Sequence, residues 1–105
     1  MAQFDVYVNT DQDTYKIYPY FIDIQNSLLD TLNSRVVIPL TPIQGADNTY
    51  PKHLCPVIEI INKKFAVLTY QLTSVPISFL QQQETSVVAS RDDIVAAIDF
   101  LVTGI

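Results

Sequence analysis

Several residue types on which common active sites depend are scarce in this sequence. It has one cysteine (Cys55), one histidine (His53) and two glycines among 105 residues. A single cysteine cannot form an internal disulfide, which is typical of a reducing compartment, and we therefore expect a cytoplasmic protein. Two glycines do not make a glycine-rich phosphate loop, and one histidine with one cysteine does not make a zinc cluster. We expect no cofactor and no metal.

Long apolar runs and positive charge are also lacking. No apolar stretch approaches the roughly 20 residues of a membrane-spanning helix, and the first eleven residues lack the basic start and apolar block of a signal peptide. Eleven acidic residues against six lysines and arginines give a net charge of −5. Neutralisation of phosphates supplies most non-specific affinity for nucleic acid. The sequence therefore predicts a protein without a membrane span that does not bind DNA strongly on its own.

Apolar residues are abundant despite these absences. They make up 49% of the chain, which excludes disorder, and 105 residues suffice for one domain that buries about two-thirds of its unfolded surface. We expect a single domain over residues 1–105, because no repeat and no linker interrupts it.

Short apolar stretches separated by polar turns predict a mainly β fold. Alternation of Phe4, Val6 and Val8 with Asp5 and Tyr7 predicts a half-buried strand. Further strands are expected at residues 15–24, 35–40, 55–61, 65–70 and 74–80, one or two helical turns at 25–34, and a glutamine-rich connector before the final helix.

Two features refine this pattern. Asn62-Lys63-Lys64 between two apolar stretches is the best hairpin signal in the chain. Pro39 and Pro42 demand an edge position or a bend, because proline cannot donate to a ladder. Many strands followed by one helix predict a small antiparallel sheet or barrel, of the SH3-like kind, closed by the C-terminal helix.

The last sixteen residues predict that helix. Ser90 is a good N-cap, Asp93 can complete a capping box with it, and Gly104 can cap the C-terminus. Large apolar residues recur at helical spacing and predict one buried stripe, formed by Ile94, Ile98, Leu101 and Ile105.

The back of this helix carries Asp92, Asp99 and Thr103, and Phe100 stands off the buried stripe. A helix that is apolar over more than one face usually contacts something besides its own domain. The last turns of the helix therefore either form a partner surface or simply end at Gly104 as the C-cap.

Candidates for chemistry are few. His53 reads as a solvated loop histidine, Cys55 as a core residue, and Asp11 with Asp13 as a polar turn, because the rest of a calcium loop is missing. Arg35 could join an acid and His53 in an RNA-cleaving site, but nothing basic surrounds it in the sequence.

Leu28-Leu29 lies on a short polar segment. Two adjacent leucines on so short a segment rarely both point inward. One of them is then free to join an exposed patch, and such patches often mark partner sites.

Six phrases together resemble the CcdB family of plasmid and chromosomal toxins, in the order and at nearly the spacing of that family. They are Gln3-Phe4-x-Val6-Tyr7, Phe21-x-Asp23-x-Gln25, Val37-Ile38-Pro39-Leu40, Thr73-Ser74-Val75-Pro76, Asp93-Ile94-x-x-Ala97-Ile98 and Gly104-Ile105. The resemblance implies a small antiparallel barrel with a C-terminal helix, an obligate homodimer and no enzymatic activity.

The resemblance also implies partners and a site. Family members bind the A subunit of DNA gyrase and trap its cleaved-DNA complex. An antitoxin with a disordered C-terminal segment neutralises them and joins them in repressing their operon. Carried over, the gyrase-binding residues are Leu28, Leu29, Asp99, Val102, Thr103, Gly104 and Ile105. Thr103 stands where the best-known member has an aromatic ring, and Asp99 replaces an amide.

Two alternatives remain open at this point. One is a sequence-specific endoribonuclease of the MazF/Kid type, which shares the barrel architecture but needs a cationic cleft with an acid–base pair. The other is a homologue that still binds its antitoxin but no longer poisons gyrase.

Overall fold

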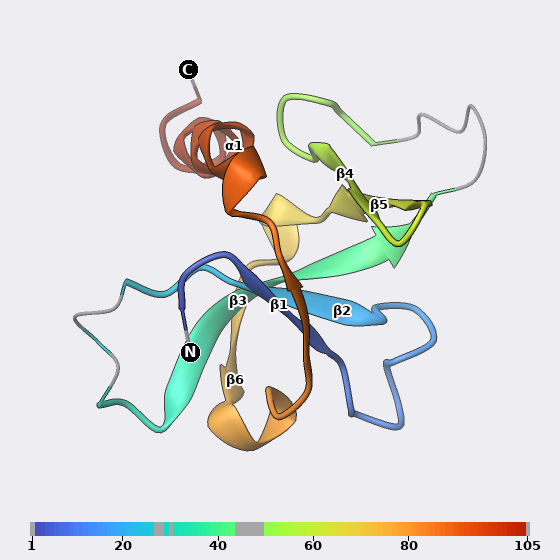
Figure 1. The fold of residues 1–105 in the computed structure, drawn as a ribbon. Coiled ribbons are helices and arrows are strands. Elements are labelled where there is room, and N and C mark those ends of the chain that lie inside the picture. The colour runs from blue at the N-terminus through green and yellow to red at the C-terminus, as the bar shows by residue number, and fades with distance from the viewer. Residues whose placement is uncertain (1, 27–28, 30, 44–49, 105) are drawn as a thin grey trace.

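An antiparallel sheet, curled into a half-barrel, carries one helix at its C-terminal end in the described part of the chain (Figure 1). The computed structural model describes residues 2–26, 29, 31–43 and 50–104. The strands are β1 (Asp5–Val8), β2 (Tyr20–Asp23), β3 (Ser34–Pro42), β4 (Val57–Ile60), β5 (Lys63–Val67), β6 (Thr73–Pro76) and β7 (Gln83–Ser86), and the helix is α1 (Arg91–Thr103). The expected fold class is confirmed.

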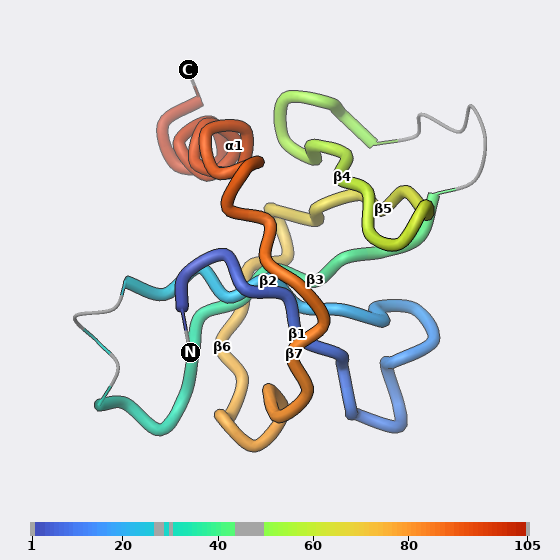
Figure 2. The backbone as a smooth tube through the Cα atoms, viewed as in Figure 1, coloured from blue at the N-terminus to red at the C-terminus, as the bar shows by residue number. Residues whose placement is uncertain are grey.

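Strand β3 holds the sheet together. Along one side it pairs with β2, and along the other it pairs first with β6 and then with β5, so the strands run in the order β4-β5-β3-β2-β1-β7 with β6 beside β3. Figure 2 shows that β7 lies beside β1, although the two strands are far apart in sequence.

Pro39 lies inside the sheet, so of the two placements expected for it, an edge or a bend, the edge is excluded. It pairs with Phe21 of β2 on one side. On the other side β6 pairs with residues 34–37 of β3 and β5 with residues 40–42, which leaves position 39 between the two partners. Because no ladder bond is required there, the missing N–H of proline costs nothing. Its carbonyl still accepts a hydrogen bond from the Leu68 N–H at 3.0 Å.

The sheet buries both of its faces. One face, with Val6, Ile22 and Ile38 in register, packs against the helix through Ile94. The opposite face carries Tyr7, Phe21 and Val37. It is covered by Val75, Phe79 and Leu80 of the β6 segment, by which we mean β6 and the residues after it as far as Leu80. The half-buried strand expected at residues 4–8 is therefore buried on both sides, because the later β6 segment supplies a second cover.

Several expected boundaries shift once tertiary partners are present. The expected strand at 15–24 shortens to Tyr20–Asp23, since residues 11–18 form successive turns. The expected strand at 74–80 ends at Pro76, and a 3-10 turn follows at Ile77–Phe79. The glutamine-rich connector contains β7, an edge strand on β1 that the sequence pattern missed. At 25–34, Leu29 donates to the Asn26 carbonyl and Leu32 to that of Leu29, which fits the expected turn.

The start of α1 corrects the expected capping box. Ser90 is the N-cap residue, but its side chain makes no capping hydrogen bond. A 3-10 turn at Val88–Ser90 leads directly into α1, so Ser90 has φ −98° and ψ 12°. A capping hydroxyl is positioned by extended backbone at the N-cap, and this entry through a helical turn removes that geometry. The C-terminal expectation is confirmed, because Gly104 is left-handed and its N–H donates to the Phe100 carbonyl.

The β4–β5 hairpin turns at Ile61-Asn62, one residue before the expected turn. Ile60 pairs with Lys63, and both turn residues have positive φ, 50° for Ile61 and 63° for Asn62. This is the type I′ geometry that suits the twist of a hairpin, and it favours Asn and Gly. A β-branched isoleucine in this conformation is strained, and Ile61 is also 71% exposed.

Replacing this residue therefore tests the turn. We expect Ile61→Asn to raise the free energy of unfolding by about 1 kcal/mol, because the left-handed conformation costs a branched residue roughly 1–2 kcal/mol. Ile17→Asn is the matched control, since Ile17 is 58% exposed and is not among the residues with positive φ. Urea midpoints measured at one protein concentration would contradict the turn assignment if both substitutions had the same effect.

Candidate functional site

The last turns of α1 form an exposed face. Ile94 and Ala97 in the first half of the helix are buried, and Val95 and Ile98 pack against the same core. Beyond them, residues 99–104 are all exposed. Figure 1 shows α1 nearly end-on, beside the sheet. Val102 is 76% exposed, and Asp99, Thr103 and Gly104 are also exposed.

The expected burial of Leu101 is wrong. It is 40% exposed in the chain, because the sheet beneath α1 supports only its first half. Phe100 is 36% exposed, and its ring meets the ring of His53 edge-on, with centroids 6.2 Å apart. The apolar stripe read from the sequence thus changes role along the helix, from core at Ile94 to surface at Leu101.

Local hydrogen bonds close the end of this helix. Thr103 lies four residues after Asp99, and its hydroxyl donates to the Asp99 carbonyl at 2.7 Å. This bond holds the Thr103 side chain against the helix, and Thr103 remains exposed beside Val102 and Gly104. Ile105 lies outside the described residues.

The second expected element is the turn between β2 and β3. Leu29 is 47% exposed there, and Leu32 is equally exposed. Leu28 lies outside the described residues. The turn leaves the sheet at the end of β2, away from α1 in Figure 1. Asp99, Val102 and Thr103 lie on the last turns of α1, and Gly104 is its C-cap. The structure therefore gathers the helix residues into one face and places Leu29 on a separate element.

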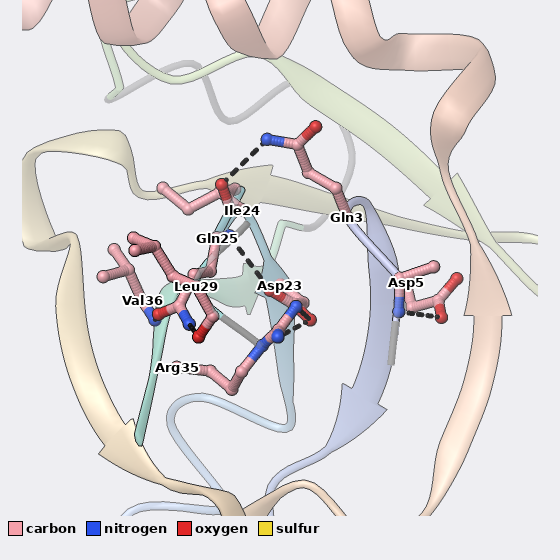
Figure 3. A network of polar contacts seen from close by, with 9 residues as sticks. Gln3, Asp5, Asp23, Ile24, Gln25, Leu29, Arg35 and Val36 are labelled. Atoms are coloured by element: carbon pink, nitrogen blue, oxygen red, sulfur yellow. Dashed lines mark hydrogen bonds and ion pairs between the residues drawn. The ribbon is translucent and has the colours of Figure 1, made fainter. Parts of the chain in front are cut away.

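A buried polar network lies at the base of the turn (Figure 3). Arg35 and Asp23 are 1% and 0% exposed, and the guanidinium donates to Asp23 Oδ2 from Nε at 3.0 Å and from a terminal nitrogen at 2.6 Å. The other carboxylate oxygen accepts the Gln25 N–H at 3.0 Å. Burial, followed by the charges of Asp5 and Asp23, raises the pKa of nearby Tyr7, while Arg35 opposes the rise. Sequence analysis missed this network, since nothing in the pattern brings residues 23 and 35 together.

The residues considered for RNA cleavage do not assemble. The Arg35 side chain is buried and bonded to Asp23, so it does not line a cleft. His53 is exposed on a loop beside Phe100. Cys55 is buried, as expected, and burial raises the pKa of its thiol, which disfavours the thiolate that a nucleophile requires.

The polar turn that contains Asp11 is held by hydrogen bonds between its own residues. The Thr14 hydroxyl donates to Asp11 Oδ2 at 2.7 Å, and the Asp11 N–H donates to Asn9 Oδ1 at 2.9 Å. Among the described residues no group of three metal-ligating side chains comes together. No helix of the described chain is both long and apolar enough to cross a membrane.

The four lysines of the chain line two neighbouring hollows. Lys16, Lys63 and Lys64 line a hollow of about 720 Å³ between the β4–β5 turn and the start of β2. Lys64 also lines a neighbouring hollow with Lys52, beside α1. None of these four lysines forms an ion pair with a described residue. The four lysines therefore lie around the β4–β5 hairpin and the hollows beside it.

Comparison with protein families bears directly on this fold. A family model described as CcdB protein matches residues 3–104. The chain belongs to the CcdB family. Members of the CcdB family are toxins of toxin–antitoxin pairs, and the half-barrel with a single C-terminal helix is the CcdB fold. The six sequence phrases therefore identified the family correctly.

Free energies of unfolding can test which residues of α1 are packed against the sheet in this CcdB-family chain. We expect Ile94→Ala to lower the free energy of unfolding by about 2–5 kcal/mol, because it empties a fully buried site. Val102→Ala should change it by no more than about 0.5 kcal/mol, as for other exposed positions. Urea unfolding at one protein concentration measures both, and equal losses would mean that the last turn of the helix is packed.

Proposed function

We propose that this CcdB-family toxin binds the A subunit of DNA gyrase and traps the cleaved-DNA complex of that enzyme. In this proposal the protein is a homodimer that acts in the bacterial cytoplasm by binding and catalyses no reaction. Its cognate antitoxin, through a disordered C-terminal segment, neutralises it and joins it in repressing the operon. The exposed last turn of α1 is the observation that carries the proposal.

Val102 is the most exposed large apolar residue of this turn. A valine on the inner face of a helix contributes about 1.5–3 kcal/mol by burial, but at 76% exposure Val102 contributes almost none of it. Phe100 and Leu101 beside it are also partly exposed. Three consecutive apolar residues on the outside of a domain favour a protein partner. We assign gyrase contact to Asp99, Val102, Thr103 and Gly104, and to Ile105 beyond the described residues.

Gly104 and Leu29 complete the proposed surface. Nothing lies within 4 Å of the place where a Cβ of Gly104 would stand, so a partner can reach the backbone there. Leu29 presents a second apolar contact on the β2–β3 turn, together with Leu28, which lies outside the described residues. In a homodimer each of these contacts occurs twice about one axis, which suits a partner that is itself two-fold symmetric.

A charge placed on the helix end tests the proposal. We expect Val102→Asp to abolish toxin-dependent linearisation of plasmid DNA by purified gyrase, because it puts a carboxylate into an apolar contact. Val88→Asp is the matched control, since Val88 is 59% exposed but lies on the 3-10 turn before α1. Both proteins should keep the melting temperature and the antitoxin affinity of the parent.

Deleting residues 103–105 extends the same test. The truncated protein should stay folded and bind antitoxin but not arrest the growth of cells with sensitive gyrase. Growth arrest retained by the truncated protein or by Val102→Asp would remove α1 from the mechanism. Cleavage of RNA by the parent protein would select the endoribonuclease alternative, and antitoxin binding without gyrase trapping would identify a homologue that no longer poisons.

The charge of the protein predicts its behaviour toward DNA. With a net charge of −5 and its four lysines around the β4–β5 hairpin, the toxin alone should not retain an operator fragment in a gel shift at moderate salt. Addition of the antitoxin should produce the retarded complex. Tight binding by the toxin alone would contradict this prediction.

A further inference from the structure

We propose that Gln25 is the positioning residue of the β2–β3 turn, and that its side-chain amide holds Leu29 in the place where it meets a partner. The contact of Leu29 with gyrase rests on the proposed function, whereas the positioning itself is argued from the geometry. Gln25 makes no contact with a partner in this proposal and acts only through the turn.

The side chain of Gln25 continues the hydrogen bonding between β2 and β3 by one bond beyond the last backbone–backbone bond. The last backbone bond between β2 and β3 runs from the Ile24 N–H to the Val36 carbonyl at 3.0 Å. The chain then turns away from β3, and the Val36 N–H donates instead to Gln25 Oε1 at 3.0 Å. The side-chain amide thus accepts the Val36 N–H, which would otherwise lose its partner where the chain turns away from β3.

The other end of the same amide reaches the turn. Gln25 Nε2 donates to the Leu29 carbonyl at 2.9 Å. Only an amide can accept from β3 and donate to the turn in this way, because a carboxylate has no hydrogen to donate. One planar group therefore fixes the distance between the sheet and the backbone of Leu29 (Figure 3).

The Asp23–Arg35 pair makes this amide rigid. Asp23 accepts the Gln25 N–H through one oxygen while Arg35 binds the other, so the backbone of Gln25 is fixed from beneath. Gln25 itself is only 4% exposed. A side chain that is buried and bonded at Oε1 and Nε2, on a residue whose backbone N–H is also bonded, has little freedom. The part of the turn bonded to it is ordered with it.

The exposed side of the turn explains why this order matters. Leu29 is half-exposed and contributes little to the core, and the described turn is held mainly by local bonds such as that from the Leu32 N–H to the Leu29 carbonyl. A partner that binds Leu29 in a mobile turn would have to order it first, at a cost in affinity. Gln25 removes that cost before binding.

Two substitutions separate the halves of the amide. Gln25→Glu keeps the acceptor for Val36 and, once its carboxyl group is ionised, loses the donor to Leu29, whereas Gln25→Met loses both without adding a charge. Asp23 and Arg35 are unsuitable for this test, because removing one partner leaves a buried unpaired charge and unfolds the site. Ile58→Val on β4, far from the turn in Figure 1, is the control for mild destabilisation.

Amide hydrogen exchange tests the positioning without any partner. We expect both Gln25 substitutions to lower the protection of the Leu29 and Leu32 amides about tenfold, the effect of losing one hydrogen bond. Only Gln25→Met should also lower the protection of the Val36 amide. Protection of the turn equal to that in Ile58→Val would overturn the proposal.

A double-mutant cycle tests the connection to function. We expect Gln25→Met to raise the toxin concentration for half-maximal gyrase cleavage at least tenfold in the parent protein, but less than twofold in a Leu29→Ala background. With Val102→Ala the two effects should multiply. Multiplying effects with Leu29→Ala, or no effect of Leu29→Ala alone, would overturn the assignment to partner contact, while exchange would still decide whether Gln25 orders the turn. Failure of the parent to trap gyrase would instead refute the proposed function.

Discussion

The structure depends on the pairing of β3 with three other strands. Its nine residues bond to β2 along one side and to β6 and β5 in turn along the other. Alternate side chains of β3 therefore enter two cores, with Ile38 toward α1 and Val37 toward the β6 segment. A shift of one residue would exchange these faces and place Arg35 in the wrong core. The register is fixed by packing on both sides of one strand.

This arrangement leaves two exposed elements beside the packed sheet, the second half of α1 and the β2–β3 turn. The first half of α1 is held by the sheet, and its last turns are exposed. The β2–β3 turn likewise begins in a fully buried ion pair and ends at a half-exposed leucine. In both places an apolar residue without a structural role stands next to a well-anchored segment, and such placement lowers the ordering cost of binding.

The sequence predicted the kind of fold and the family better than it predicted the details. Strand periodicity, the C-terminal amphipathic stretch and Gly104 identified the elements, because these signals are local. The half-burial expected for β1 was wrong, and so was an edge position for Pro39. Both outcomes depend on β6, which begins nearly seventy residues after the start of β1 and about 35 residues after Pro39. β7 was missed because an edge strand of polar residues has no apolar pattern. Leu101 was placed in the core because periodicity does not show where the supporting sheet ends, and the partners of Gln25 are set by tertiary contacts. The helix residues assigned to gyrase gather on one face, but their role stays a prediction.

The pairing of β1 with β7 has a consequence for synthesis of the toxin. β1 leaves the ribosome before the other strands, yet its partner β7 is the last strand of the sheet, so the half-barrel cannot close until all of the strands have been made. At roughly 5–20 residues per second, synthesis of 105 residues takes about 5–20 s. During that interval β1 has an open edge and the core beneath α1 is incomplete. A nascent chain of this topology therefore exposes its strands before it presents a finished helix end.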